Sequence, residues 1–156
     1  MAQTNLHITL SDEAATAALA ERIARILKSG DTLLLEGEIG AGKTAFARAT
    51  IRAMLGRDED VPSPTFTLVQ TYDTPRGPVW HCDLYRLTHP DEVMELGLDE
   101  ALTDAICLIE WPDRLGADSP TNALHLAFVA RAADHAVTLT IPDSWANRMK
   151  ALDVGA

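Results

Sequence analysis

The segment from Gly37 to Thr44, GEIGAGKT, matches the phosphate-loop pattern G-x-x-x-x-G-K-[ST] at every fixed position. It lies between an apolar run, residues 32–36, and a segment expected to be a helix, residues 43–55, which is the setting that the motif requires. Glycine permits backbone conformations that turn successive N–H groups toward phosphate oxygens, and the helix N-terminus attracts the same anion. The pattern predicts a nucleotide site in which Lys43 reaches the β- and γ-phosphates and the Thr44 hydroxyl coordinates magnesium.

Two acidic residues are candidates for the metal-binding carboxylate that P-loop proteins place at the end of a neighbouring buried strand. Glu110 ends the apolar run 106–109, and Asp83 lies near the end of the strand-like run 79–85. A surface carboxylate is the plain alternative for Glu110, and an ion pair with Arg86 is the alternative for Asp83. We expect Glu110 to hold the metal and Asp83 to lie near it.

Two further segments carry polar groups with less specific patterns. Ser63-Pro64-Thr65 follows the predicted helix, and its prolines stiffen a turn that presents hydroxyl groups, which suits a switch-like loop over the γ-phosphate. An ordinary connector is an equally good interpretation. His81 and Asp83 share one face of a strand and could form a metal pair, but a structural histidine is the commoner case.

The rest of the chain alternates between helical and strand-like segments, which indicates an α/β fold. Two hairpins make the sheet mixed, and the expected architecture is a P-loop NTPase fold with helices on both faces of a mixed parallel and antiparallel sheet. The expected elements are a helix from an N-cap at Ser11 to Gly30, a hairpin of residues 66–72 and 79–85, an acidic helical region at 91–102, a second buried strand at 105–111, and a hairpin of residues 124–129 and 137–141.

Length and composition fit a single domain. We expect the 156 residues to form one P-loop ATPase domain, residues 1–146, and a loosely ordered tail, residues 147–156. No apolar run approaches the roughly 20 residues of a membrane helix and no signal peptide is visible, which predicts a cytoplasmic protein without a membrane partner. Cys82 and Cys107 lack any metal or redox spacing, so both are expected to be reduced core thiols.

The formal net charge is −10. Proteins that grip nucleic-acid backbone normally present a basic surface. Any connection to nucleic acid is therefore expected to run through a partner. The alternative is that the acidity only serves solubility.

Four segments, taken together and in this order, resemble the TsaE family, the P-loop ATPases of bacterial tRNA threonylcarbamoyladenosine biosynthesis. The resemblance covers about residues 10–141, and two loop features depart from the commoner form. Glu38-Ile39 stands where Asp-Leu is more usual, and Ala45 stands where threonine is frequent; both changes are conservative because the loop binds phosphate through backbone N–H groups. The segments are GEIGAGKT (37–44), SPTFTLV (63–69), HCDLYRL (81–87) and ICLIEWPDR (106–114).

This resemblance implies a weak ATPase that binds ATP and Mg²⁺, acts with TsaD- and TsaB-type subunits, and reaches tRNA only through that complex. By position, Lys43, Asp83, Glu110 and Thr65 would be the catalytic residues, and Thr44 and Glu110 would hold the metal. Ser11 would lie where the family approaches the adenine. The residues expected to contact the cofactor are Ser11, Glu38, Ile39, Gly40, Ala41, Gly42, Lys43, Thr44, Ala45 and Trp111.

Two other functions remain open on the sequence. A small P-loop kinase would phosphorylate a metabolite, although such kinases usually need an arginine-rich lid and none is visible among the 13 basic residues. A nucleotide-gated scaffold would use the ATP-bound state to control docking, with incidental hydrolysis. A GTPase is disfavoured because the guanine-reading run N-K-x-D is absent.

Overall fold

Two short, mostly apolar strands form the centre of the sheet. β2 (Thr32–Glu36) and β5 (Ile106–Glu110) lie side by side in parallel, and nearly all of their side chains are buried. Strands covered on both faces are apolar throughout rather than alternating, which explains the pattern of both segments. β6 (Leu124–Ala130) continues the parallel arrangement beyond β2, and β4 (Gly77–Asp83) does so beyond β5.

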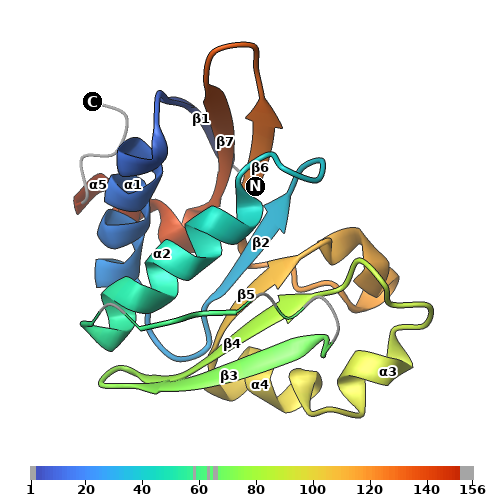
Figure 1. Cartoon of the computed structure of the whole chain (residues 1–156). Coiled ribbons are helices and arrows are strands. Elements are labelled where there is room, and N and C mark those ends of the chain that lie inside the picture. The colour runs from blue at the N-terminus through green and yellow to red at the C-terminus, as the bar shows by residue number, and fades with distance from the viewer. Residues whose placement is uncertain (1–2, 58, 63, 65–66, 152–156) are drawn as a thin grey trace.

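The computed structural model describes residues 3–57, 59–62, 64 and 67–151. Its seven strands form one sheet in the order β1-β7-β6-β2-β5-β4-β3 (Figure 1), with antiparallel pairings of β1 with β7, β6 with β7, and β3 with β4. The remaining elements are β1 (Gln3–Leu10), α1 (Glu13–Ile26), α2 (Lys43–Leu55), β3 (Val69–Thr74), α3 (Asp91–Met94), α4 (Leu98–Asp104), η1 (Pro112–Asp118), β7 (His135–Pro142), η2 (Asp143–Trp145) and α5 (Ala146–Ala151).

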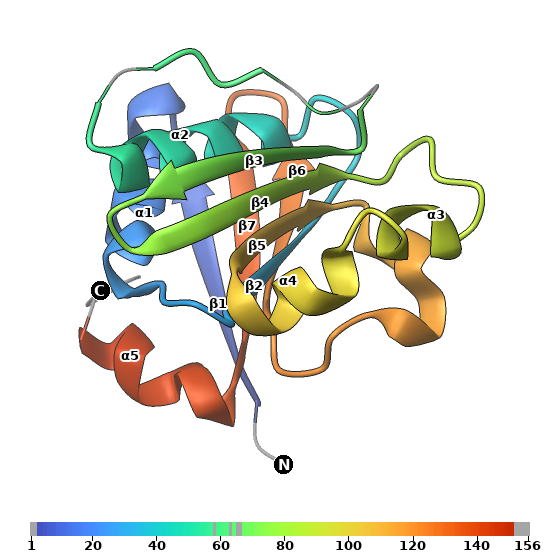
Figure 2. The same ribbon diagram turned by 90° about the horizontal axis from the view of Figure 1, so that it is seen from below.

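Helices cover both faces of the sheet, as Figure 2 shows with α1 and α2 on one side and α3 and α4 on the other. Each face has its own hydrophobic core. Ile23 of α1 and Phe46 of α2 belong to one core with Leu108 of β5, whereas Leu98 of α4 belongs to the other with Ile109. Successive residues of a strand point to opposite faces, so β5 contributes to both cores. The predicted mixed α/β fold with helices on both faces is confirmed.

The first helix begins later and ends earlier than the sequence suggested. Asp12, not Ser11, is the N-cap of α1, and its Oδ1 accepts a hydrogen bond from the Ala15 backbone N–H at 2.8 Å. Aspartate caps a helix as well as serine does, so the Ser-Asp pair offered two adjacent caps. Leu27 is already extended, which ends the helix before Gly30.

Both ends of the chain contain elements that the sequence analysis did not predict. β1 pairs along its length with β7 at one edge of the sheet. Where a loose tail was expected from Asn147, the structure has α5, with Met149 buried and Arg148 held by two hydrogen bonds to the Asp31 carboxylate at 2.6 and 3.1 Å. Residues 152–156 lie outside the described part of the chain.

The topology brings functional segments to one edge. β6, β2, β5 and β4 are parallel, so their carboxyl ends meet beside the loop that joins β2 to α2. In open α/β sheets, ligands bind in the crevice outside the carboxyl ends of the strands. None of the helices in the described ranges is long and apolar enough to cross a membrane.

Candidate nucleotide and metal site

The loop between β2 and α2 depends on glycines with left-handed backbone conformations. Gly37 has a φ of +141°, and a Cβ added there would lie 2.5 Å from the carbonyl oxygen of Phe128. Gly42 has a φ of +112° and directly precedes α2, which has no side-chain N-cap hydrogen bond. Because the first N–H groups of a helix have no partner within the helix, this end can bind an anion. The loop therefore has the backbone geometry that the motif predicts.

Lys43 is folded back onto the loop. It is 5% exposed, and Nζ donates hydrogen bonds to the carbonyl oxygens of Gly37 and Glu38. The ring of Trp111 lies over the same ammonium group, with its centroid 3.8 Å from Nζ. Burial lowers the pKa of Lys43, and the attraction of nearby carboxylates, chiefly Glu110, acts in the opposite direction. An ammonium held in such a partly dry site gains from an anionic partner, which a phosphate would supply.

Two carboxylates end neighbouring strands beside this lysine. Asp83 of β4 and Glu110 of β5 are paired in register, and they are 5% and 1% exposed. Thr44 Oγ1 donates a hydrogen bond to Glu110 Oε1 at 2.8 Å, and Glu110 Oε2 lies 2.7 Å from His81 Nε2. This burial excludes the alternative that Glu110 is a surface carboxylate. The structure thus brings together residues that are 66 positions apart in the sequence, Thr44 and Glu110.

The donors around Thr44 fit a magnesium ion. Hydroxyl and carboxylate oxygens are hard ligands, and Mg²⁺ usually combines one or two carboxylates with phosphate oxygens and water. Within the described part of the chain, no group of three or more His, Cys, Asp or Glu side chains could hold a metal ion. Phosphate oxygens and water would have to complete the ligand set, as expected for a metal that binds together with a nucleotide.

Every residue expected to contact the cofactor lines a hollow at the phosphate loop. A hollow of about 410 Å³ contains the two carboxylates, and one of about 510 Å³ lies between the start of α1, the loop and the β6–β7 turn. Thr65, expected in a switch-like loop, lies outside the described residues. The first hollow is lined by Ile39, Gly40, Gly42, Lys43, Thr44, Ala45 and Trp111; Ser11, Ala41 and again Gly40, Gly42 and Ala45 line the second; Glu38 lines a third of about 430 Å³.

Two histidines that were not among the predicted site residues lie at the site. His81 contacts Glu110, and His135 Nε2 lies 3.3 Å from the carbonyl oxygen of Gly40 in the hollow beside α1. The sequence showed that His81 shares a strand face with Asp83, and a structural histidine was the favoured interpretation, but it did not show that Glu110 ends the neighbouring strand. His135 gave no local signal, since it reaches the loop only through the β6–β7 hairpin.

The chain is similar to proteins of one known family. The family model described as "Threonylcarbamoyl adenosine biosynthesis protein TsaE" matches residues 10–137. The chain belongs to the TsaE family. The tRNA threonylcarbamoyladenosine biosynthesis protein TsaE of Rickettsia bellii is 43% identical over 126 residues, which cover 81% of this chain and 88% of that protein. The TsaE protein of Bacillus subtilis is 39% identical over 120 residues, or 76% of this chain and 73% of its own length.

Solved structures extend the similarity to the ends of the chain. The crystal structure of Bacillus subtilis YdiB superposes with a TM-score of 0.80 at 28% identity and covers 98% of this chain and 97% of its own. The family predicted from four short motifs is thus confirmed, and its model spans the phosphate loop, Asp83 and Glu110. The TsaE match also includes both histidines at the site.

Proposed function

We propose that this TsaE-family chain is a Mg²⁺-dependent ATPase that serves the formation of threonylcarbamoyladenosine on tRNA. The observation that supports this most directly is the 2.8 Å hydrogen bond between Thr44 and Glu110 at the N-terminus of α2. In P-loop NTPases, a hydroxyl of the loop and a carboxylate from a neighbouring strand hold the magnesium ion that accompanies the nucleotide. Here the two groups already meet beside the loop.

Different residues of the site would bind the phosphates, the magnesium ion and the adenosine of ATP. Lys43 would exchange its carbonyl partners for phosphate oxygens, and the N–H groups at the start of α2 would bind the same anion. Thr44 and Glu110 would hold the magnesium ion, which when bound neutralises developing negative charge on the phosphates. Asp83 is paired in register with Glu110, and its carboxylate would contact a water bound to that ion. The hollow that contains Ser11 would receive the adenosine end of the nucleotide.

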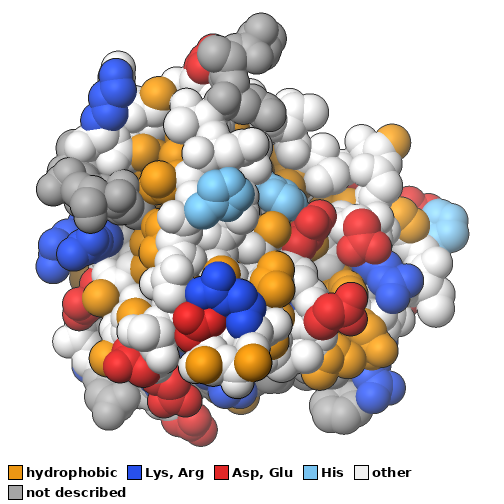
Figure 3. All heavy atoms as spheres, turned by 90° about the horizontal axis from the view of Figure 1, so that it is seen from above, with side chains coloured by type: hydrophobic (Ala, Val, Ile, Leu, Met, Phe, Trp, Pro, Cys, Tyr) orange, Lys and Arg blue, Asp and Glu red, His pale blue; other side chains and the backbone are white. Residues whose placement is uncertain are grey.

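The proposed partners are TsaD- and TsaB-type subunits, and tRNA is reached only through them. The net charge of −10 disfavours direct binding to the phosphate backbone of tRNA. On the face shown in Figure 3, Lys and Arg side chains are separated by acidic and uncharged ones rather than joined in a basic surface. A cytoplasmic location without a membrane partner is part of the same proposal.

The test is reconstitution with TsaD- and TsaB-type subunits, measuring ATP turnover and ATP-dependent modification of tRNA. We expect slow turnover that the subunits alter, and we expect Glu110→Ala to bind ATP while losing turnover and modification by a factor of at least about 100. The matched control is Asp99→Ala, an exposed carboxylate in the first turn of α4.

Two outcomes would replace this proposal. Transfer of the γ-phosphate to a soluble metabolite would favour the kinase. Full tRNA modification by a Glu110→Ala protein that binds ATP but does not hydrolyse it would favour the nucleotide-gated scaffold.

A further inference from the structure

His81 occupies a position where an apolar side chain would be expected. It lies in β4 between β3 and β5, is completely buried, and points to the same face as Val79, which belongs to the core formed with α1 and α2. Its Nδ1 has no hydrogen-bond partner among the described residues. A buried polar atom without a partner is costly, so the ring must contribute something that a leucine there could not.

That contribution is the contact with Glu110. His81 Nε2 lies 2.7 Å from Glu110 Oε2, and because a carboxylate oxygen can only accept, Nε2 carries the hydrogen. Glu110 is itself 1% exposed, and a buried carboxylate needs such a donor. The two oxygens of Glu110 are therefore divided: His81 holds Oε2, and Oε1 faces Thr44.

The division matters for a metal ion. A glutamate side chain has three rotatable bonds and can offer either oxygen or both to a cation, whereas a carboxylate fixed at one oxygen offers only the other. Partners of this kind orient the groups that bind the metal, and their loss typically weakens metal binding 10- to 100-fold. Among the described residues, the other side chain that hydrogen-bonds to the Glu110 carboxylate is Thr44, which lies on the metal side and does not replace the His81 donor.

We infer that His81 is a positioning residue, which holds Glu110 Oε2 so that Oε1 is presented beside Thr44 to the divalent cation. The inference rests on the proposed function, because it requires a cation at Thr44 and Glu110. It adds a residue of β4 to the site and explains why a histidine lies in the core two residues before Asp83. The loss of His81 is therefore expected to weaken binding of the divalent cation and to leave metal-free nucleotide binding unchanged.

The experiment measures the cation directly. Mn²⁺ is titrated into the full chain in the presence of ADP, and bound Mn²⁺ is followed by electron paramagnetic resonance; ADP binding is measured separately in EDTA. We expect His81→Leu, which removes the donor, to raise the half-saturating Mn²⁺ concentration about 10- to 100-fold while ADP binding in EDTA is unchanged. The structural control is Val79→Ala on the same face of β4, which leaves a cavity but no missing donor.

A second pair of variants covers the case in which His81→Leu does not fold. His81→Gln can still place an N–H near Glu110, and His81→Asn carries the same amide on a shorter side chain. We expect glutamine to restore Mn²⁺ binding to within about 3-fold of the unsubstituted protein and asparagine not to.

Three results would overturn the inference. Equal Mn²⁺ binding by the His81→Gln and His81→Asn variants would contradict the positioning role of His81. So would a loss of Mn²⁺ binding in His81→Leu that is no larger than the loss in Val79→Ala. Either result would leave the proposed function intact. ADP binding by the unsubstituted protein that ignores Mg²⁺ and Mn²⁺ contradicts the proposed function as well.

Discussion

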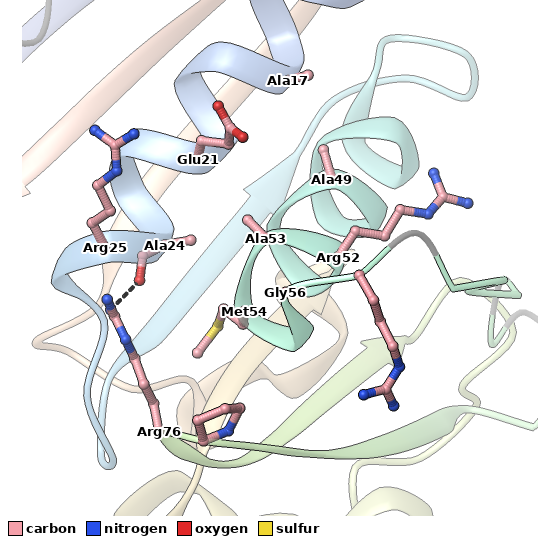
Figure 4. A pocket seen from close by; sticks show the side chains of 12 residues that line it. Ala17, Glu21, Ala24, Arg25, Ala49, Arg52, Ala53, Met54, Gly56 and Arg76 are labelled. Carbon is pink, nitrogen blue, oxygen red and sulfur yellow. Dashed lines mark hydrogen bonds between the residues drawn. The ribbon is translucent and has the colours of Figure 1, made fainter.

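The two ends of α2 adjoin hollows that differ in size and in the chemistry of their linings. At the C-terminal end, a hollow of about 740 Å³ lies between α1, α2 and the β3–β4 turn (Figure 4). At the N-terminal end, the hollows at the phosphate loop measure about 410 and 510 Å³. The C-terminal hollow is larger, and four arginines line it: Arg25, Arg52, Arg57 and Arg76.

Arg57 and Arg76, two of those arginines, pair with groups of the protein itself. Arg76 donates to the carbonyl oxygen of Ala24 near the end of α1, and Arg57 forms an ion pair with Glu59 at 2.7 Å. In Figure 4 the labelled arginines point in different directions rather than toward one place. At the phosphate loop, by contrast, an ammonium, a hydroxyl and two carboxylates from α2, β4 and β5 converge. Convergence of groups, rather than volume or the number of positive charges, marks the candidate site.

The largest expected effect distinguishes Lys43 at the phosphate loop from Arg25 at the C-terminal hollow. Lys43→Ala should weaken ATP binding about 100-fold or more, because charge-assisted hydrogen bonds to phosphate are lost from a partly dry site. Arg25→Ala, an exposed cation at the other hollow, should leave ATP affinity within about 2-fold. Isothermal titration calorimetry with both variants measures the difference directly.

Unchanged ATP affinity in Lys43→Ala would remove the phosphate loop from the binding site. A large loss in Arg25→Ala would instead assign anion binding to the C-terminal hollow. The thermal stability of the Lys43→Ala variant is measured as well. Burial lowers the pKa of the Lys43 ammonium in the folded protein, so folding disfavours its charged form. This cost of burying the charge offsets part of the loss of the contacts with Gly37, Glu38 and Trp111, so we expect the thermal midpoint to change little.

The glycine that opens the phosphate loop and the glycine that follows α2 give the next comparison. Gly37→Ala would place a Cβ 2.5 Å from the Phe128 carbonyl oxygen, so the loop has to move. We expect about a 10-fold loss of ATP affinity together with a loss of stability of about 2 kcal/mol, from the clash and the left-handed backbone. Gly56→Ala, with a φ of +74° and nothing within 4 Å of the added Cβ, should cost about 1 kcal/mol of stability and leave ATP affinity unchanged.

Chemical denaturation and ATP titration of the same two variants separate these effects. Equal affinities for ATP in the Gly37 and Gly56 variants would mean that the close approach to Phe128 does not shape the phosphate loop.

The parts of the fold that were predicted from the sequence are those that a short stretch of chain determines. The phosphate loop and α2 follow from one continuous motif, and the apolar runs of β2 and β5 follow from burial on both faces. The end of α2 at Gly56 was also expected, since glycine there adopts a left-handed conformation. Each of these depends on neighbours in the sequence.

The parts that were missed depend on contacts between distant residues. β1 forms through pairing with β7, and α5 is held by Arg148 on Asp31, which is 117 positions away in the sequence. The contact of His81 with Glu110 spans 29 positions and requires β4 and β5 to be parallel and in register. A short apolar and polar pattern does not determine which strands are neighbours, so these contacts could not be read from local sequence.

The smallest expected effect tests whether the arginines of the C-terminal hollow are structural. Arg76→Ala removes the hydrogen bonds to the carbonyl oxygens of Ala24 and Leu27 at the end of α1, although Ala24 keeps the hydrogen bond from the Leu27 backbone N–H. Because Arg76 is exposed and water can replace it, we expect a loss of about 1 kcal/mol in the free energy of unfolding, with ATP affinity unchanged. Urea denaturation measures the first quantity and ATP titration the second. Arg76→Lys keeps the charge but not the planar donor group, so it should recover less than half of the loss; full recovery would mean that the end of α1 requires the positive charge rather than the hydrogen-bond geometry.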